Sequence, residues 1–118
     1  MPKVMVLEDD LTLLDLLQSL LGFEGYEVVV LEGFDQVVDD LRAHNPDGLI
    51  LDIQLDEKNG LDLLDEIRED ETLKQPYVLA CSGLDYANEA RQRGANDFIM
   101  KPYMPDDLVK LLKENIKQ

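Results

Sequence analysis

The stretch Gly48-Leu49-Ile50-Leu51-Asp52 places a carboxylate directly after a short run of uncharged residues. A continuous apolar run of this kind is typical of a strand that is covered on both faces, as in a parallel sheet. A carboxylate at the end of such a strand is costly unless another group pairs with it. Val4-Met5-Val6-Leu7 ends in the same way, at Glu8 and Asp9. These two strand ends indicate both the class of fold and the place to search for a function.

Short apolar runs alternate with amphipathic stretches outward from these two strands. The predicted strands are Lys3–Leu7, Glu27–Leu31, Gly48–Leu51, Tyr77–Cys81 and Asp97–Met100. The predicted helices are Asp10–Leu21, Phe34–His44, Gly60–Asp70, Tyr86–Arg93 and about Pro105–Lys117. Asp10 is a suitable N-cap for the first helix, and Gly22 a suitable end. Five strand–helix units in series predict an α/β fold, with one parallel sheet and helices on both of its faces.

The length and composition predict a single domain, residues 1–118, that buries a core without disulfide or metal support. The one cysteine, Cys81, lies in an apolar run and is predicted to be a small buried side chain, which suits a reducing compartment. No stretch approaches the roughly 20 apolar residues that span a bilayer. The N-terminus lacks the pattern of a signal peptide. We therefore expect a cytoplasmic protein without membrane attachment.

The charge balance is strongly acidic, with 11 basic and 26 acidic residues and a formal net charge of −15. A surface of this sign repels phosphate backbones, which argues against direct binding of nucleic acid by this chain. It favours cations or basic partners instead.

Polar side chains follow all five predicted strands, and ligands bind at the carboxyl ends of parallel strands. The second strand contributes only Glu32 and Gly33, which suits an edge position outside the site, so the residues after the other four strands are the candidates. In chain order they are Glu8, Asp9 and Asp10, then Asp52, then Ser82, and finally Lys101. Carboxylates gathered at one edge repel each other unless one holds a proton or a cation lies among them. Oxygen ligands without histidine or cysteine favour Mg²⁺ over zinc.

A lysine and a hydroxyl opposite these acids supply the positive charge and the hydrogen-bond donor that a phosphoryl group needs. An aspartate can itself act as a nucleophile and form an acyl phosphate. The set therefore predicts phosphoryl transfer onto Asp52.

The chain resembles the receiver domains of response regulators in two-component signalling, over essentially its whole length. Four segments carry the resemblance, each after a predicted strand: Glu8-Asp9-Asp10, Asp52 after its apolar run, Ser82-Gly83, and Phe98-Ile99-Met100-Lys101-Pro102. Gly60, eight residues after Asp52, matches the glycine that ends the loop after the third strand in that family. The resemblance implies a flavodoxin-like, doubly wound sheet of five parallel strands in the order 2-1-3-4-5, with five helices.

The resemblance also implies roles for the acidic residues. Asp52 is then the phosphoacceptor and a ligand of Mg²⁺. Asp9 binds the metal directly, and Glu8 acts through water. The backbone carbonyl of Gln54 completes the share of the metal shell that the protein supplies.

Three further residues receive roles from the same resemblance. Lys101 pairs with the phosphoryl oxygens, and the peptide bond between Lys101 and Pro102 is expected to be cis. Ser82 donates a hydrogen bond to the phosphoryl group and moves toward it. Phe98 corresponds to the aromatic residue whose rotamer follows that movement, although a plain core role for Phe98 is equally compatible with the sequence.

The family relationship implies partners as well. The phosphodonor is a phosphohistidine on a sensor histidine kinase or a phosphotransfer protein. The receiver is a phosphoacceptor that takes part in its own phosphorylation and dephosphorylation, not a turnover enzyme. The output, through the face built from the fourth helix, the fifth strand and the fifth helix, controls a downstream effector or a fused output domain. A phosphorylation-dependent homodimer on that face is a further partner to test.

One segment departs from the family pattern. The chain between Ser82 and Gly94 is shorter than the resemblance leads us to expect, so either the fourth helix is short or the loop before it is shortened, and the output face is left open to question. The alternative function is therefore a phosphorylation-independent interaction scaffold on a receiver fold. A phosphatase with an aspartate nucleophile fits less well, because Glu8 stands where such enzymes need their first aspartate. A flavodoxin-like electron carrier would need a Ser/Thr-rich phosphate loop after the first strand, and none is present.

Overall fold

Five parallel strands form one sheet in the order β2-β1-β3-β4-β5 in the computed structural model, which describes residues 1–117. The strands are β1 (Lys3–Leu7), β2 (Glu27–Val30), β3 (Gly48–Asp52), β4 (Tyr77–Ser82) and β5 (Asp97–Met100). The helices are α1 (Leu11–Phe23), α2 (Val37–His44), α3 (Gly60–Glu69), α4 (Ala87–Gln92) and α5 (Pro105–Asn115). The predicted α/β architecture and strand order are confirmed.

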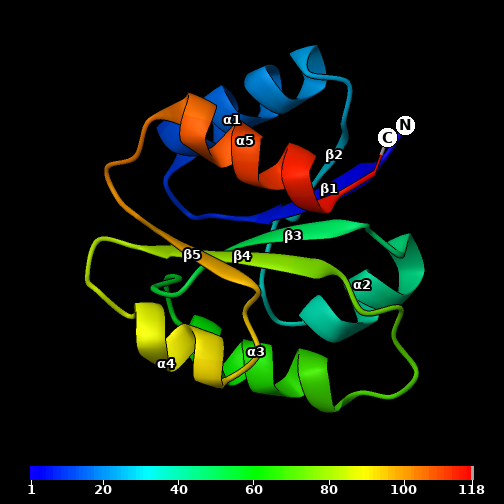
Figure 1. Ribbon diagram of the computed structural model, residues 1–118. Coiled ribbons are helices and arrows are strands. Elements are labelled where there is room, and N and C mark those ends of the chain that lie inside the picture. The colour runs from blue at the N-terminus through cyan, green and yellow to red at the C-terminus, as the bar shows by residue number, and fades with distance from the viewer. Residues whose placement is uncertain (118) are drawn as a thin grey trace.

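The sheet lies between two layers of helices, with α1 and α5 on one face and α2, α3 and α4 on the other (Figure 1). Alternation of side chains along the strands explains this arrangement. Val4 and Val6 of β1 pack with residues of α1 and α5, whereas Met5 and Leu7 pack with residues of α2 and α3. Because both faces are buried, the strands need the continuous apolar runs from which they were predicted.

The strand ends line up at one edge of the sheet. Leu7 of β1 pairs with Leu51 of β3, Asp52 with Cys81 of β4, and Ser82 with Met100 of β5. The residues that follow each pair therefore leave the sheet side by side, at its carboxyl edge. This register is what brings residues far apart in the sequence into one site.

The first helix begins as predicted but ends later. The Asp10 carboxylate caps it, accepting hydrogen bonds from the backbone N–H groups of Thr12 (3.0 Å) and Leu13 (3.2 Å). The prediction that Gly22 ends the helix is wrong, because α1 continues to Phe23. The chain turns instead at Gly25, whose φ of 97° lies in the left-handed region that glycine adopts without strain. The helix therefore ends close to Gly25, where the backbone adopts a left-handed conformation, and not at Gly22, the first glycine in the sequence.

The fourth helix is short, as predicted, and spans only Ala87–Gln92. Two arginines tie its C-terminal end to the rest of the molecule. The guanidinium of Arg93 pairs with Asp62 (2.9 Å) and Asp65 on α3. Arg68 of α3 donates through Nε to the carbonyl of Gly94 at 2.9 Å. Side-chain bonds thus supply the anchoring that two helical turns alone do not give.

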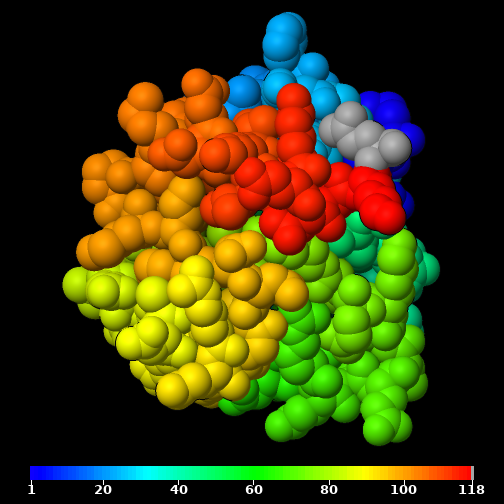
Figure 2. All heavy atoms as spheres, in the orientation of Figure 1, coloured from blue at the N-terminus to red at the C-terminus, as the bar shows by residue number. Residues whose placement is uncertain are grey.

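The segments α4, β5 and α5 lie side by side on one continuous face of the molecule, where they run from yellow through orange to red (Figure 2). Exposed apolar side chains on this part of the chain include Leu84, Met100 and Met104.

Within residues 1–117, no helix is long and apolar enough to cross a membrane.

Candidate functional site

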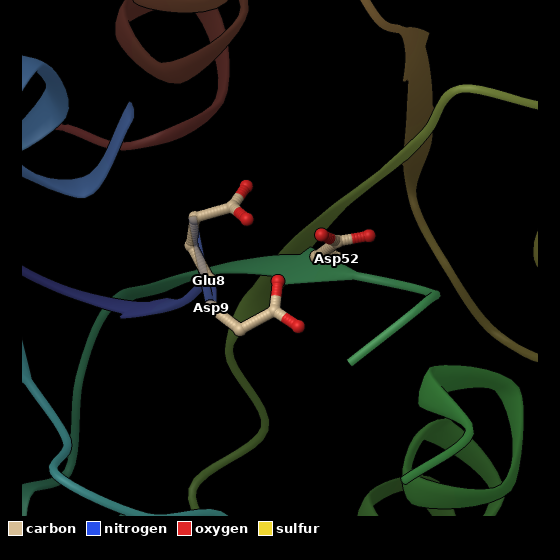
Figure 3. Close-up of side chains that lie close together, drawn as sticks. All are labelled: Glu8, Asp9 and Asp52. Carbon is tan, nitrogen blue, oxygen red and sulfur yellow. The ribbon is translucent and has the colours of Figure 1, made fainter. Parts of the chain in front are cut away.

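Three carboxylates meet at the carboxyl edge of the sheet (Figure 3). Glu8 and Asp9 follow β1, and Asp52 ends the neighbouring β3. One oxygen from each of the three side chains lies within 4.8 Å of the others. Glu8 and Asp52 are each 4% exposed, whereas Asp9 is exposed to solvent. The sequence-predicted acidic residues are therefore brought together, with two of them largely removed from water.

Lys101 places an ammonium group between the two buried carboxylates. Its Nζ lies 2.6 Å from Glu8 Oε1 and 2.9 Å from Asp52 Oδ2, and its side chain is 23% exposed. Burial lowers the pKa of Lys101, but the hydrogen bonds to Glu8 and Asp52 outweigh that effect and raise it above its ordinary value. Lys101 is therefore fully charged at neutral pH. One cation balances two anions here, so the site keeps an excess of negative charge.

The excess of negative charge disfavours the ionised form of Glu8. Its Oε2 accepts a hydrogen bond from the backbone N–H of Asp10 at 3.1 Å, while Oε1 faces Lys101. Burial raises the pKa of Glu8 above its usual value, against the hydrogen bond from Lys101, and the neighbouring charge of Asp52 adds to the rise. A cation bound nearby would stabilise the ionised form of Glu8.

The loop after β3 fixes the direction of the Asp52 carboxylate. The backbone N–H of Gln54 donates to Asp52 Oδ1 at 3.0 Å, and Gln54 also forms a β-bridge with Asn59. The loop closes at Gly60, whose N–H donates to the carbonyl of Ile53 at 2.7 Å. A Cβ at Gly60 would lie 2.6 Å from Ile53 Cα and 2.7 Å from the Asp52 carbonyl oxygen. Only glycine allows this close approach of loop and strand.

Ser82 lies at the end of β4 and is 0% exposed. Its hydroxyl donates to Gln54 Oε1 at 3.2 Å and accepts from the backbone N–H of Leu84 at 3.1 Å. The backbone carbonyl of Ser82 accepts from the N–H of Lys101 at 2.8 Å, which joins the ends of β4 and β5. The lysine and the hydroxyl thus leave neighbouring strands at the same edge as Asp52.

The sequence also singles out Phe98, Cys81 and the peptide bond between Lys101 and Pro102. Phe98 of β5 is half-buried and packs against the core on the side of α2, α3 and α4. Cys81 is buried, and that burial raises the pKa of its thiol well above the usual range. The peptide bond between Lys101 and Pro102 is cis, as predicted.

Sequence reasoning missed two contacts at this site. It assigned only the backbone carbonyl of Gln54, whereas the side chain of Gln54 contacts Ser82. It placed Lys101 against a phosphoryl group and did not foresee its pairing with Glu8. Neither contact leaves a local pattern, because each joins side chains from different strand ends. The one available signal was the excess of acids over bases at the strand ends.

The donor set suits a hard divalent cation. It consists of carboxylate oxygens at a strand edge, without a nitrogen or sulfur ligand among the three clustered side chains. Glu8 and Asp9 also line an open cleft of about 500 Å³ between α1, the end of β2 and the loop after β3. An ion can therefore reach the exposed Asp9 from solvent without rearrangement of the sheet.

Comparison with known proteins agrees with this geometry. A family model described as the response regulator receiver domain matches residues 4–113. The chain is 29% identical to the DNA-binding response regulator MtrA of Mycolicibacterium paratuberculosis, over 98% of this chain and 52% of that protein. It is 27% identical to the chemotaxis protein CheY of Bacillus subtilis, over 97% of each chain.

A solved structure gives the same picture. The BeF3-activated receiver domain of Klebsiella pneumoniae RstA superimposes with a TM-score of 0.87 at 28% identity, covering 98% of this chain and 99% of that one. The chain spans about half the length of the DNA-binding regulators that it matches.

Proposed function

The chain belongs to the response regulator receiver domain family, and we propose that it is a phosphorylation-activated signalling switch with Asp52 as the phosphoacceptor. The observation that carries this proposal is the position of the Asp52 carboxylate. It is largely buried, its Oδ2 lies 2.9 Å from Lys101 Nζ, and its Oδ1 is held by the backbone of Gln54. A carboxylate oriented in this way, with a cation already beside it, is prepared to receive a group that bears negative charge.

The proposed reaction is an in-line transfer from a phosphohistidine. An oxygen of Asp52 forms a bond to phosphorus while the bond from phosphorus to the donor's imidazole nitrogen breaks, and the imidazole keeps that electron pair. The product is an acyl phosphate on Asp52. Lys101 then exchanges its contact with the free carboxylate for one with the phosphoryl oxygens, which carry more charge.

We propose Mg²⁺ as the cofactor, with Asp9 and Asp52 as side-chain ligands, Glu8 acting through water and Gln54 contributing its backbone carbonyl. When bound, the ion neutralises charge on the transferring phosphoryl group. The residues fit this role, because the excess of carboxylate over ammonium at the edge requires one more cation. Asp9 needs the least adjustment, since its side chain already faces solvent.

The readout that we propose runs from Ser82 to the output face. The hydroxyl of Ser82 turns to donate to the phosphoryl group, and Phe98 repacks in the space beside it. The face formed by α4, β5 and α5 then shifts between two packed arrangements, and a partner that prefers one of them supplies the output. The short α4 keeps the phosphorylation-independent scaffold as the alternative outcome of the test below.

The proposed partners follow from the family and from the length of the relatives. A sensor histidine kinase or phosphotransfer protein, located in the cytoplasm with this chain, donates the phosphoryl group. A downstream effector or a fused output domain receives the signal, and a phosphorylation-dependent homodimer is one form this output can take. The chain acts as a single receiver domain over residues 1–118, and it does not turn over small phosphoesters.

The test uses Mg²⁺ and beryllofluoride, which stands in for a phosphoryl group on an aspartate. We expect NMR resonances around Ser82 and Phe98 to shift in the wild type and to stay in place in Asp52→Asn. Incubation with a small phosphodonor should add one phosphoryl group to the wild type alone, as measured by mass spectrometry. If the wild type responds to neither reagent, the switch proposal fails and the scaffold reading takes its place.

A further inference from the structure

The Ser82 hydroxyl makes two hydrogen bonds within the protein. It donates to Gln54 Oε1 at 3.2 Å, while the backbone N–H of Leu84 donates to its oxygen at 3.1 Å. Ser82 is 0% exposed, so water does not compete freely for its proton. Both of its hydrogen-bonding functions are therefore satisfied within the protein.

A hydroxyl has one proton and can donate one strong hydrogen bond at a time. The bond to Gln54 and a bond to a phosphoryl group on Asp52 both require that proton, so they exclude each other. The contact with Leu84 uses the oxygen as an acceptor and does not compete. Of the two contacts that hold Ser82, only the one to Gln54 competes for the proton that a phosphoryl group requires.

Gln54 is well placed to act on both groups. Its backbone N–H fixes the Asp52 carboxylate at 3.0 Å, and its backbone pairs with Asn59 across the loop. The main chain of Gln54 is thus held in place, while its side chain extends from an exposed position to Ser82. The acceptor carboxylate and the switch hydroxyl are connected through a single residue.

We propose that the side chain of Gln54 is a positioning residue that holds Ser82 in the resting arrangement and so sets how readily the switch responds. This inference rests on the proposed function and deepens it. A bond that stabilises only the resting state must be lost on activation, so its removal shifts the equilibrium toward the active arrangement. For a net hydrogen bond of ordinary strength, the shift is roughly two- to tenfold.

Two substitutions separate the hydrogen bond from the shape of the side chain. Gln54→Met keeps the length but removes the acceptor, whereas Gln54→Glu keeps an acceptor oxygen at the same position. Both retain the backbone groups that contact Asp52 and Asn59. Because the side chain of Gln54 is exposed, both variants are expected to fold.

The first measurement needs no ligand and is independent of phosphorylation. We expect three-bond NMR couplings to report one χ1 rotamer of Ser82 in the wild type and in Gln54→Glu, and an average over rotamers in Gln54→Met. A single, unchanged rotamer in Gln54→Met would overturn the proposal, whether or not the protein responds to beryllofluoride.

The second measurement is the affinity for beryllofluoride in saturating Mg²⁺. We expect Gln54→Met to bind roughly two- to tenfold more tightly than the wild type, and the difference to vanish when Ser82→Ala is present in both. An equal gain in the Ser82→Ala background would show that Gln54 acts elsewhere and would also overturn the proposal. A wild type that binds no beryllofluoride contradicts the proposed function, while the rotamer measurement still decides the role of Gln54.

Discussion

Lys101 Nζ lies 2.9 Å from Asp52 Oδ2, so the residue after β5 neutralises the carboxylate at the end of β3. The same ammonium group lies 2.6 Å from Glu8 Oε1. Removal of this cation leaves two buried carboxylates facing each other. The electrostatic balance of the whole strand edge therefore depends on one side chain.

We expect Lys101→Met to lower the free energy of unfolding of the metal-free protein by about 1–3 kcal/mol, the usual cost of leaving buried polar groups unpaired. Mg²⁺ should restore more stability to this variant than it adds to the wild type, because it replaces the missing positive charge. Urea denaturation with and without Mg²⁺ measures both effects.

A matched control for that substitution is Lys110→Met, whose side chain is 75% exposed and 4.0 Å from Glu114. It should leave the stability nearly unchanged, as exposed ion pairs contribute little. Equal effects of the two substitutions would contradict the role assigned to Lys101.

The raised pKa of Glu8 predicts a pH dependence with a definite sign. Because burial favours the neutral form in the folded state, the contribution of Glu8 to stability is complete below its ordinary pKa of 4.5 and is lost as the pH rises through the raised pKa of the folded state. Glu8→Gln stays neutral, so this variant should be at least as stable as the metal-free wild type near neutral pH. It should also lack that part of the decline with rising pH.

The cost of Glu8→Gln should appear in metal binding. If Glu8 holds the metal through water, we expect Mg²⁺ affinity to fall by roughly ten- to hundredfold, as is typical for groups that contact a metal's ligands. Denaturation over a pH series, together with Mg²⁺ titration, tests both parts. A metal-free variant less stable than the wild type near neutral pH would contradict the electrostatic argument.

Gly60→Ala should disturb the loop that aims Asp52. The added methyl group would lie 2.6 Å from Ile53 Cα, and backbone at that distance cannot move without shifting the strand. We expect a loss of about 1–3 kcal/mol, as for other overpacked sites, and a weaker response to beryllofluoride. Gly83→Ala is the control, because a Cβ there meets no heavy atom within 4 Å. A similar loss in both variants, measured by urea denaturation, would rule out the steric explanation.

Arg68→Met should remove the hydrogen bonds that hold the end of α4 and the starts of β4 and β5 in place. The guanidinium donates to the carbonyls of Gly94 (2.9 Å) and Pro76 (3.0 Å) and to Asn96 Oδ1 (2.9 Å), and burial lowers its pKa. The loss of these bonds should cost about 1–3 kcal/mol and speed hydrogen exchange in α4 and at the start of β4. Arg42, whose side chain is exposed, forms ion pairs with Asp39 (2.8 Å) and Asp70 (2.9 Å). Arg42→Met removes these exposed pairs and should have a clearly smaller effect on both measurements.

Much of this architecture could be predicted from the sequence because its signals are local. Two short segments each indicate a buried strand and are followed directly by a polar residue: Val4-Met5-Val6-Leu7 and Gly48-Leu49-Ile50-Leu51. The end of α1 was harder to predict. Positions 22 and 25 are both glycine, so residue type does not show which of them follows the helix, and only the positive φ of Gly25 distinguishes them.

Contacts between side chains from distant elements were outside the reach of sequence patterns. In the sequence Arg68 is an ordinary arginine of a predicted helix. In the structure it donates hydrogen bonds to Gly94 and Asn96, which lie 26 and 28 positions further along the chain. The bond between Gln54 and Ser82 depends in the same way on the register of β3 and β4. In these cases the sequence predicts the strands, and the geometry of the sheet then determines which side chains meet.

The register at the strand edge has a consequence for synthesis of the protein. Glu8 and Asp52 are translated within the first half of the chain, but Lys101 follows Asp52 by 49 residues. A ribosome-bound chain that has not yet released β5 holds both acids without their balancing ammonium group. The acidic strand edge is therefore expected to gain its balancing charge only after β5 has left the ribosome and paired with β4.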